Sequence, residues 1–130
     1  MLFIKSRKNF QHLASIMGGE NRVHTHIWLK ATGALCQLKA NPGYYTQLKN
    51  STDLIYPNPD FHQIEMDVMR TYPHVEVAKT KEKLEGQLRN ILNCFLKRNA
   101  KIGYFQGLNF LACHLLNVMK HEEYAFWTLC

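Results

Sequence analysis

Apolar residues along this chain recur at spacings of three and four positions, which is the period of an amphipathic α-helix. The pattern predicts helices over residues 4–17, 22–38, 61–70, 80–98 and 107–119, and a last helix that begins near His121. The one segment with a strand signal, residues 75–77, is short and is assigned to a loop. The sequence therefore predicts an all-α fold.

Glycine and capping residues predict where these helices begin and end. Gly33 interrupts the second predicted helix, either as a close packing contact or as a break. Residues 40–60 contain two proline-bearing turns and are predicted to be a connection. Asp60 is expected to cap the helix that follows this connection, and Thr80 is expected to cap the long helix after it.

Two segments near the end of the chain are strongly apolar. Residues 107–119 are apolar on nearly every face, which predicts a helix buried in the centre of the fold. The last segment stops inside an apolar run with Phe126, Trp127 and Leu129, so we expect a fragment of a larger domain. Burying a side chain such as Phe126 contributes roughly 1.5–3 kcal/mol, so leaving several of them wet predicts a poorly stable fragment.

Composition and charge exclude several classes of protein. A chain of 130 residues with 46% hydrophobic residues matches one globular domain. The net charge is +6, but Lys and Arg are scattered, which favours a solvated surface over a nucleic-acid-binding arm.

His and Cys show no structural zinc spacing, so no metal site is predicted. The cysteines lie in apolar contexts, which is typical of buried thiols in a reducing compartment. The sequence also shows neither a signal peptide nor a membrane-spanning stretch, so we expect a cytoplasmic protein.

Two short motifs carry the candidate chemistry. They are Ile64-x-x-Asp67-x-x-Arg70-Thr71 and Gly103-Tyr104-Phe105-Gln106-Gly107. An arginine and a glutamine offered to another protein's bound GTP can accelerate its hydrolysis, because arginine neutralises phosphoryl charge and glutamine orients the attacking water. The residues alone leave simpler alternatives open. Asp67 and Arg70 can form a surface ion pair worth under about 1 kcal/mol, and Gln106 can be an ordinary polar loop residue.

At these motifs the sequence resembles the TBC domain, the catalytic domain of Rab GTPase-activating proteins. The second motif continues as GLNFLACHLLNVMKHEEYAFWTL, which is similar to the longest signature block of that family. Upstream, the segment from Gly18 to Gly33, with Ile27-Trp28 inside it, resembles the opening block, and all three blocks occur in the family's order. The resemblance covers residues 18–130 and implies there an irregular helical TBC domain truncated at its C-terminus. Residues 1–17, which contain the first helix predicted from periodicity, are then an N-terminal flanking helix.

The resemblance also implies roles for individual residues. Arg70 becomes an arginine finger and Gln106 a glutamine finger, and we expect both on one exposed groove, converging on a phosphate-sized point. The supporting or partner-binding positions are Ile64, Asp67, Thr71, Gly103, Tyr104, Gly107, Asn109 and Trp28. His24 stands where the family usually has arginine, which lowers the expectation of activity more than that of the fold.

The first hypothesis is a GTPase activator for a Rab-family protein in its GTP-bound form, acting in trans without a cofactor of its own. The chain has no Gly-x-x-x-x-Gly-Lys-Ser/Thr loop, so it is not predicted to hydrolyse nucleotide itself. This hypothesis implies a role in vesicle trafficking and peripheral association with endomembranes through the partner. The alternative is a non-catalytic module that binds a GTPase or a membrane-trafficking partner without stimulating hydrolysis.

Overall fold

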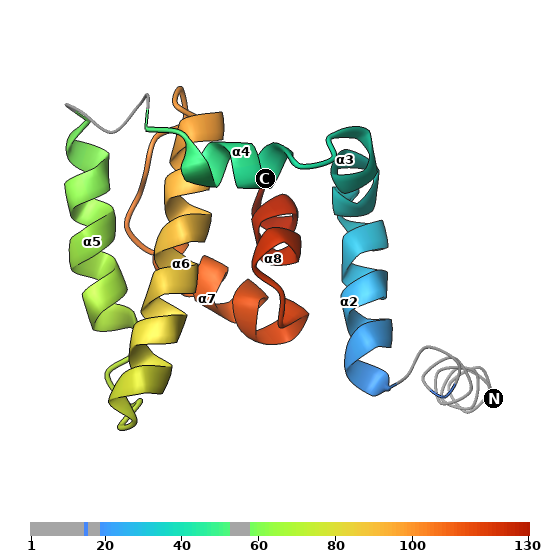
Figure 1. Cartoon of the computed structure of the whole chain (residues 1–130), viewed down its shortest axis with the longest axis horizontal. Helices are drawn as coiled ribbons and strands as arrows, with labels where there is room; N and C mark the ends of the chain where they lie inside the picture. The colour runs from blue at the N-terminus through green and yellow to red at the C-terminus, as the bar shows by residue number, and fades with distance from the viewer. Residues whose placement is uncertain (1–14, 16–18, 53–57) are drawn as a thin grey trace.

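The computed structural model describes residues 15, 19–52 and 58–130, and this part of the chain forms seven α-helices and no strand (Figure 1). The helices are α2 (Glu20–Ala31), α3 (Ala34–Ala40), α4 (Tyr44–Asn50), α5 (Pro59–Thr71), α6 (Ala78–Arg98), α7 (Leu108–Met119) and α8 (Glu122–Leu129). The all-α prediction is therefore confirmed. The helix predicted over residues 4–17 falls, apart from Ser15, outside the described residues.

The longest of these helices, α6, lies at the centre of the packing. It contacts α4, α5, α7 and α8, and Figure 1 shows α5 along one side of it and α8 along another. Its buried stripe includes Leu88, Ile91, Leu92 and Phe95, which recur at the predicted spacing. Burying each such side chain contributes roughly 1.5–3 kcal/mol, so α6 is the main apolar support of the fold.

Two predicted helix boundaries are decided by the structure. Gly33 has a left-handed backbone with φ of 78° and separates α2 from α3. A Cβ atom added there would meet nothing within 4 Å, so Gly33 is a break and not a close packing contact. At the start of α6 the N-cap position is Val77 and no side chain caps the helix. The expectation that Thr80 caps this helix is therefore wrong.

The start of α5 also differs from the prediction. The side-chain oxygen of Asn58 accepts a hydrogen bond from the backbone N–H of Asp60 at 3.0 Å, which makes Asn58 the cap. Pro59 follows in the first turn, where its missing N–H would have had no helical partner. The prediction of Asp60 as the cap is wrong, and its carboxylate is left for a different contact.

A short helix, α4, lies inside the segment that the sequence predicted to be only a connection. Its Tyr45 is buried, with its ring centroid 4.9 Å from that of Phe126. The hydroxyl of Tyr45 donates to a carboxylate oxygen of Glu122 at 2.6 Å, and this bond ties α4 to α8. A helix of 7 residues is marginal by itself, so α4 owes its stability to these tertiary contacts.

A buried lysine holds the C-terminal end of α4 against α6. Lys97 is 9% exposed, and its ammonium donates to the carbonyl oxygens of Leu48 and Ser51 at 2.8 and 2.6 Å. The last carbonyls of a helix lack intrahelical donors and form the negative end of its dipole. Lys97 therefore places a cation at this negative end and donates to both carbonyls, of which that of Leu48 also accepts from the N–H and the hydroxyl of Ser51.

The burial of apolar side chains on the last two helices, α7 and α8, differs from the prediction. On α7, Phe110 and Leu111 are 62% and 51% exposed, so the prediction of a helix enclosed on every face is wrong. On α8, Phe126 and Trp127 are 0% and 2% exposed, so the expectation of wet aromatic side chains there is wrong as well. The cover of α8 comes from the aromatic residues of α4 and from packing against α3, α6 and α7.

We expect Lys97→Met to lower the free energy of unfolding by about 1–3 kcal/mol, because the apolar stem remains while the carbonyls of Leu48 and Ser51 lose the bonds that the ammonium donates. Lys83→Met, at an exposed position of the same helix, should change it by less than about 0.5 kcal/mol. Urea denaturation followed by circular dichroism measures both variants. Equal losses in the two would contradict the capping role of Lys97.

Candidate functional site

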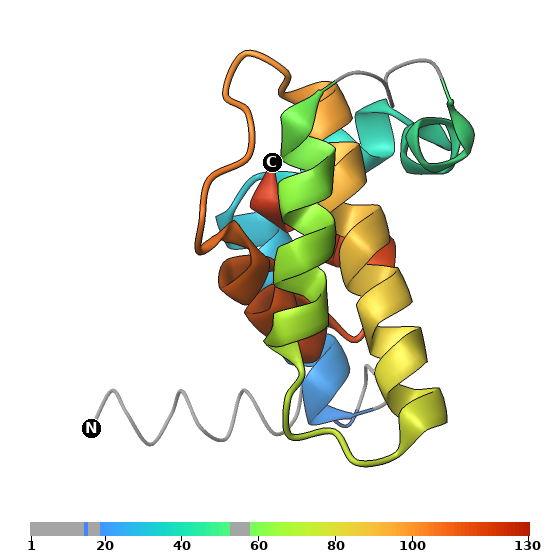
Figure 2. The same cartoon turned by 90° about the vertical axis from the view of Figure 1, so that its left-hand side faces the viewer.

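Most of the predicted site residues lie on α5 and on the loop of residues 99–107, which joins α6 to α7 and is called the connecting loop. Figure 2 shows the connecting loop (orange) running beside α5 (green) from the end of α6 to the start of α7. Ile64 is fully buried and anchors α5 in the core. Asp67 and Thr71, one helical turn apart, form the hydrogen bonds that join α5 to the connecting loop and α7.

Asp67 is the centre of these contacts. Its side chain is almost fully buried, at 6% residue exposure. One carboxylate oxygen accepts from the Tyr104 hydroxyl at 2.7 Å, and the other accepts from the Gln63 amide at 3.1 Å. The ion pair between Asp67 and Arg70, which the sequence left open, is not formed. A buried carboxylate must find donors, and here neutral donors from the helix and the connecting loop supply them.

The hydroxyl of Tyr104 is held as a donor. Burial raises the pKa of Tyr104 above its ordinary range, and the hydrogen bond to Asp67 raises it further because a phenolate would face a carboxylate. Tyr104 therefore stays protonated at physiological pH and donates to Asp67 throughout.

A second hydrogen bond joins α5 to the start of α7. The hydroxyl of Thr71 accepts from the side-chain amide of Asn109 at 2.9 Å and donates to the backbone carbonyl of Asp67 at 2.7 Å. Asn109 is 3% exposed, so this bond lies in the interior. The first motif is thus held at two points, by the bond from Tyr104 of the second motif to Asp67 and by the bond from Asn109 of α7 to Thr71.

A third contact involves a residue that the sequence did not indicate as part of the site. The backbone N–H of Tyr104 donates to a carboxylate oxygen of Asp60 at 3.0 Å. Gly103 has φ of 74°, and a Cβ atom added to it would lie 3.1 Å from the same oxygen. Gly107, with φ of 101°, occupies the N-cap position of α7. Both glycines therefore supply left-handed backbone that other residues rarely adopt, and Gly103 also leaves room for Asp60.

The two predicted fingers lie beside these contacts, and both are exposed. Arg70 precedes Thr71 on α5, and its Nε donates to the carbonyl of Met66 at 3.2 Å. Gln106 lies in the connecting loop two residues after Tyr104. Neither side chain is buried, as a group that reaches a partner requires. Their convergence on one point stays a prediction.

Trp28 is not brought together with the other predicted residues. It lies on α2, which packs against α3, α7 and α8. Both views place α2 on the far side of the molecule from α5 (Figures 1 and 2). The indole is 40% exposed there. The contacts of α2 therefore do not support a role for Trp28 in the site of Arg70 and Gln106.

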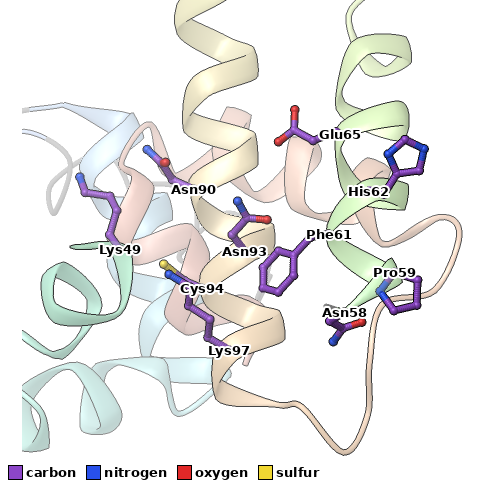
Figure 3. Close-up of a pocket in the computed structure, with 10 residues that line it drawn as sticks. All are labelled: Lys49, Asn58, Pro59, Phe61, His62, Glu65, Asn90, Asn93, Cys94 and Lys97. Carbon is purple, nitrogen blue, oxygen red and sulfur yellow. The ribbon is translucent and has the colours of Figure 1, made fainter. Parts of the chain in front are cut away.

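A cleft of about 550 Å³ lies on another side of α5, between α4, α5 and α6 (Figure 3). Phe61 and Asn93 face each other across it, and Lys49 and Lys97 line the side nearest α4. The cleft includes neither of the predicted fingers. It is therefore separate from the candidate site.

Within residues 15, 19–52 and 58–130, no group of three or more His, Cys, Asp or Glu side chains is placed to hold a metal ion. In the same part of the chain, none of the helices has the length and hydrophobicity that crossing a bilayer requires.

Comparison with known proteins identifies relatives over most of the chain. The family model described as Rab-GTPase-TBC domain matches residues 21–130. Growth hormone-regulated TBC protein 1 of Homo sapiens is 37% identical over 106 residues, covering 79% of this chain and 30% of that protein. Its namesake in Xenopus laevis is 33% identical over 115 residues, covering 86% of this chain and 33% of that protein. TBC1 domain family member 2B of Xenopus tropicalis is 41% identical over 93 residues, covering 70% of this chain and 10% of that protein.

The chain thus spans 30% and 33% of the length of the first two relatives. No solved structure matches it.

A double-mutant cycle tests the link between the two motifs. Tyr104→Phe should lower the free energy of unfolding by about 1–3 kcal/mol, because it leaves a buried carboxylate short of one donor. Once Asp67→Ala has removed the carboxylate, the same substitution should cost much less. Urea denaturation of the wild-type chain, both single variants and the double variant gives the coupling energy. Additive losses would show that this hydrogen bond contributes nothing to the fold.

Proposed function

This chain belongs to the Rab-GTPase-TBC domain family, and on that premise we propose that it accelerates GTP hydrolysis by a Rab-type small GTPase. The GTPase in its GTP-bound form supplies the nucleotide and its magnesium ion. This chain supplies Arg70 and Gln106 in trans.

Arg70 acts by electrostatics. During phosphoryl transfer, negative charge spreads over the oxygens of the γ-phosphoryl group and the leaving oxygen, and a guanidinium placed beside them stabilises that charge. Arginine needs no activation, because it is always protonated, and its planar fork can contact two oxygens at once. The exposure of Arg70 at the C-terminal end of α5 is compatible with this reach.

Gln106 acts by orientation. A carboxamide does not titrate usefully, so it is a poor general base. It carries both an acceptor and a donor, however, and can fix an attacking water in line with the phosphoryl group. Its place in an exposed loop, flanked by two glycines of the second motif, lets the backbone approach a partner closely.

The observation that carries the proposal is the pair of hydrogen bonds that join α5 to the connecting loop and to the start of α7. Asp67 with Tyr104 and Thr71 with Asn109 join the end of α5 to the segment that contains Gln106. The joining groups are buried or partly buried, while both proposed fingers remain exposed. Fingers that act on one transition state need a fixed separation, and this arrangement supports one.

We expect Arg70→Ala in the full-length protein to reduce stimulated GTP hydrolysis by about 10³-fold or more, the usual worth of an arginine finger. Arg70→Lys should fail similarly, because an ammonium does not reproduce the planar fork. Gln106→Ala should cost about 10²–10³-fold, as the loss of one positioned transition-state group does. Phosphate release against a panel of GTP-loaded Rab proteins measures these rates.

Arg22→Ala and Gln47→Ala are matched controls, since both residues are exposed on other helices. They should leave stimulation unchanged. Full activity of Arg70→Lys would end the arginine-finger assignment. Binding of a GTP-loaded Rab protein without any stimulation by the wild-type protein would favour the non-catalytic module instead.

A further inference from the structure

We propose that Asp60 is a positioning residue for Gln106, acting through the backbone of Tyr104. The inference rests on the proposed function of Gln106 as a finger. Asp60 belongs to neither of the two sequence motifs and lies at the opposite end of α5 from Arg70. Its carboxylate fixes the connecting loop at the point where the chain approaches Gln106.

The geometry of Tyr104 is the first ground. This residue is held at both of its ends by carboxylates of the same helix. Its backbone N–H donates to Asp60 at 3.0 Å, and its hydroxyl donates to Asp67 at 2.7 Å. The two acids are seven residues apart, which places them about two turns apart on nearly the same side of α5. Tyr104 therefore lies along α5 with its position and its direction both determined.

The position of Gln106 in the chain is the second ground. Asp60 fixes the loop two residues before Gln106, and the start of α7 fixes it after Gly107. Gly103 and Gly107 on either side have positive φ values and permit many alternative backbone conformations. Backbone bonds to the carbonyl of Asn99 hold the start of the loop to the end of α6. Without the bond to Asp60, the bond from the Tyr104 hydroxyl to Asp67 would be the remaining hydrogen bond from the loop to α5 among the described residues.

The fit between Asp60 and Gly103 is the third ground. A Cβ atom at Gly103 would lie 3.1 Å from the carboxylate oxygen of Asp60, so the absence of a side chain at Gly103 lets the carboxylate come this close. Asp60 does not cap α5, because Asn58 does so. The carboxylate of Asp60 is therefore available for the connecting loop.

The alternative to positioning is a purely structural role for Asp60, because an acid in the first turn of a helix interacts favourably with the helix dipole. Two substitutions separate that role from positioning. Asp60→Asn removes the charge, and with it the dipole interaction, but keeps an oxygen that can accept from the Tyr104 N–H. Asp60→Ala removes both. Asn58→Ala, the matched control, removes the capping bond that the backbone N–H of Asp60 donates and leaves the carboxylate of Asp60 in place.

The first measurement is the stimulated hydrolysis rate of a responsive GTP-loaded Rab protein as a function of the concentration of the full-length protein. Asp60→Ala should lower the maximal rate by about 10- to 100-fold and leave the half-saturating concentration within about two-fold, as expected when a catalytic group is misplaced by a fraction of an ångström to an ångström. Asp60→Asn should restore most of the rate. Asn58→Ala should lower the melting temperature but keep the maximal rate.

The second measurement does not depend on activity. Amide hydrogen exchange, followed by nuclear magnetic resonance, should show the Tyr104 N–H exchanging at least about tenfold faster in Asp60→Ala than in the wild type or Asp60→Asn, because exchange reports local opening. A wild-type protein that stimulates no Rab protein would refute the proposed function, while unchanged exchange at Tyr104 would refute the tether. Equal loss of rate in Asp60→Asn and Asp60→Ala, or in Asn58→Ala and Asp60→Ala, would also overturn the positioning role.

Discussion

The buried carboxylate of Asp67 is the constraint on which the candidate site depends. A charge with 6% exposure and no cation beside it must be surrounded by donors, or the helix that carries it cannot pack. The donor that meets this need from outside α5 is the hydroxyl of Tyr104. Because Ile64 and Val68 fix α5 in the core, the carboxylate has a defined position, and the connecting loop must come to it. The need to solvate one buried charge thus determines where a surface loop lies.

The candidate site contains two kinds of residue. Some form the hydrogen bonds that fix the connecting loop and α7 against α5, and two exposed residues, Arg70 and Gln106, are proposed to act on the bound GTP of a partner. The sequence identified both kinds only through a family resemblance, because the contacts join residues 37 and 38 positions apart, and no periodicity encodes such pairs. From the residues alone, a surface ion pair between Asp67 and Arg70 was the favoured interpretation. What decided against that pair was burial of the carboxylate, which depends on how α5, α6 and α7 pack. The contact of Asp60 with the connecting loop was missed for a related reason, since its partner there is a backbone N–H.

In the fold, the elements with a long apolar stripe were predictable and the short one was not. The spacing of Leu88, Ile91 and Leu92 is enough to define α6. By contrast, α4 is held by polar and aromatic contacts with distant segments, through Tyr45 to α8 and Lys97 from α6. The cap of α5 was misplaced by two residues because Asn and Asp are both good caps. Apolarity in α7 was misread as complete burial, although sequence cannot say which apolar face is covered.

The length of α6 has a consequence for how this domain can vary. Its 21 residues carry the chain about 30 Å, from the end of α5 back to the level at which α5 begins. One inserted or deleted residue would rotate everything beyond it by about 100° and shift it by about 1.5 Å. The connecting loop would then leave α6 in the wrong direction to meet α5. The length of α6 therefore determines where the connecting loop begins. We expect evolution to permit substitutions on its exposed surface but to select against insertions and deletions within it, even though none of its residues belongs to the candidate site.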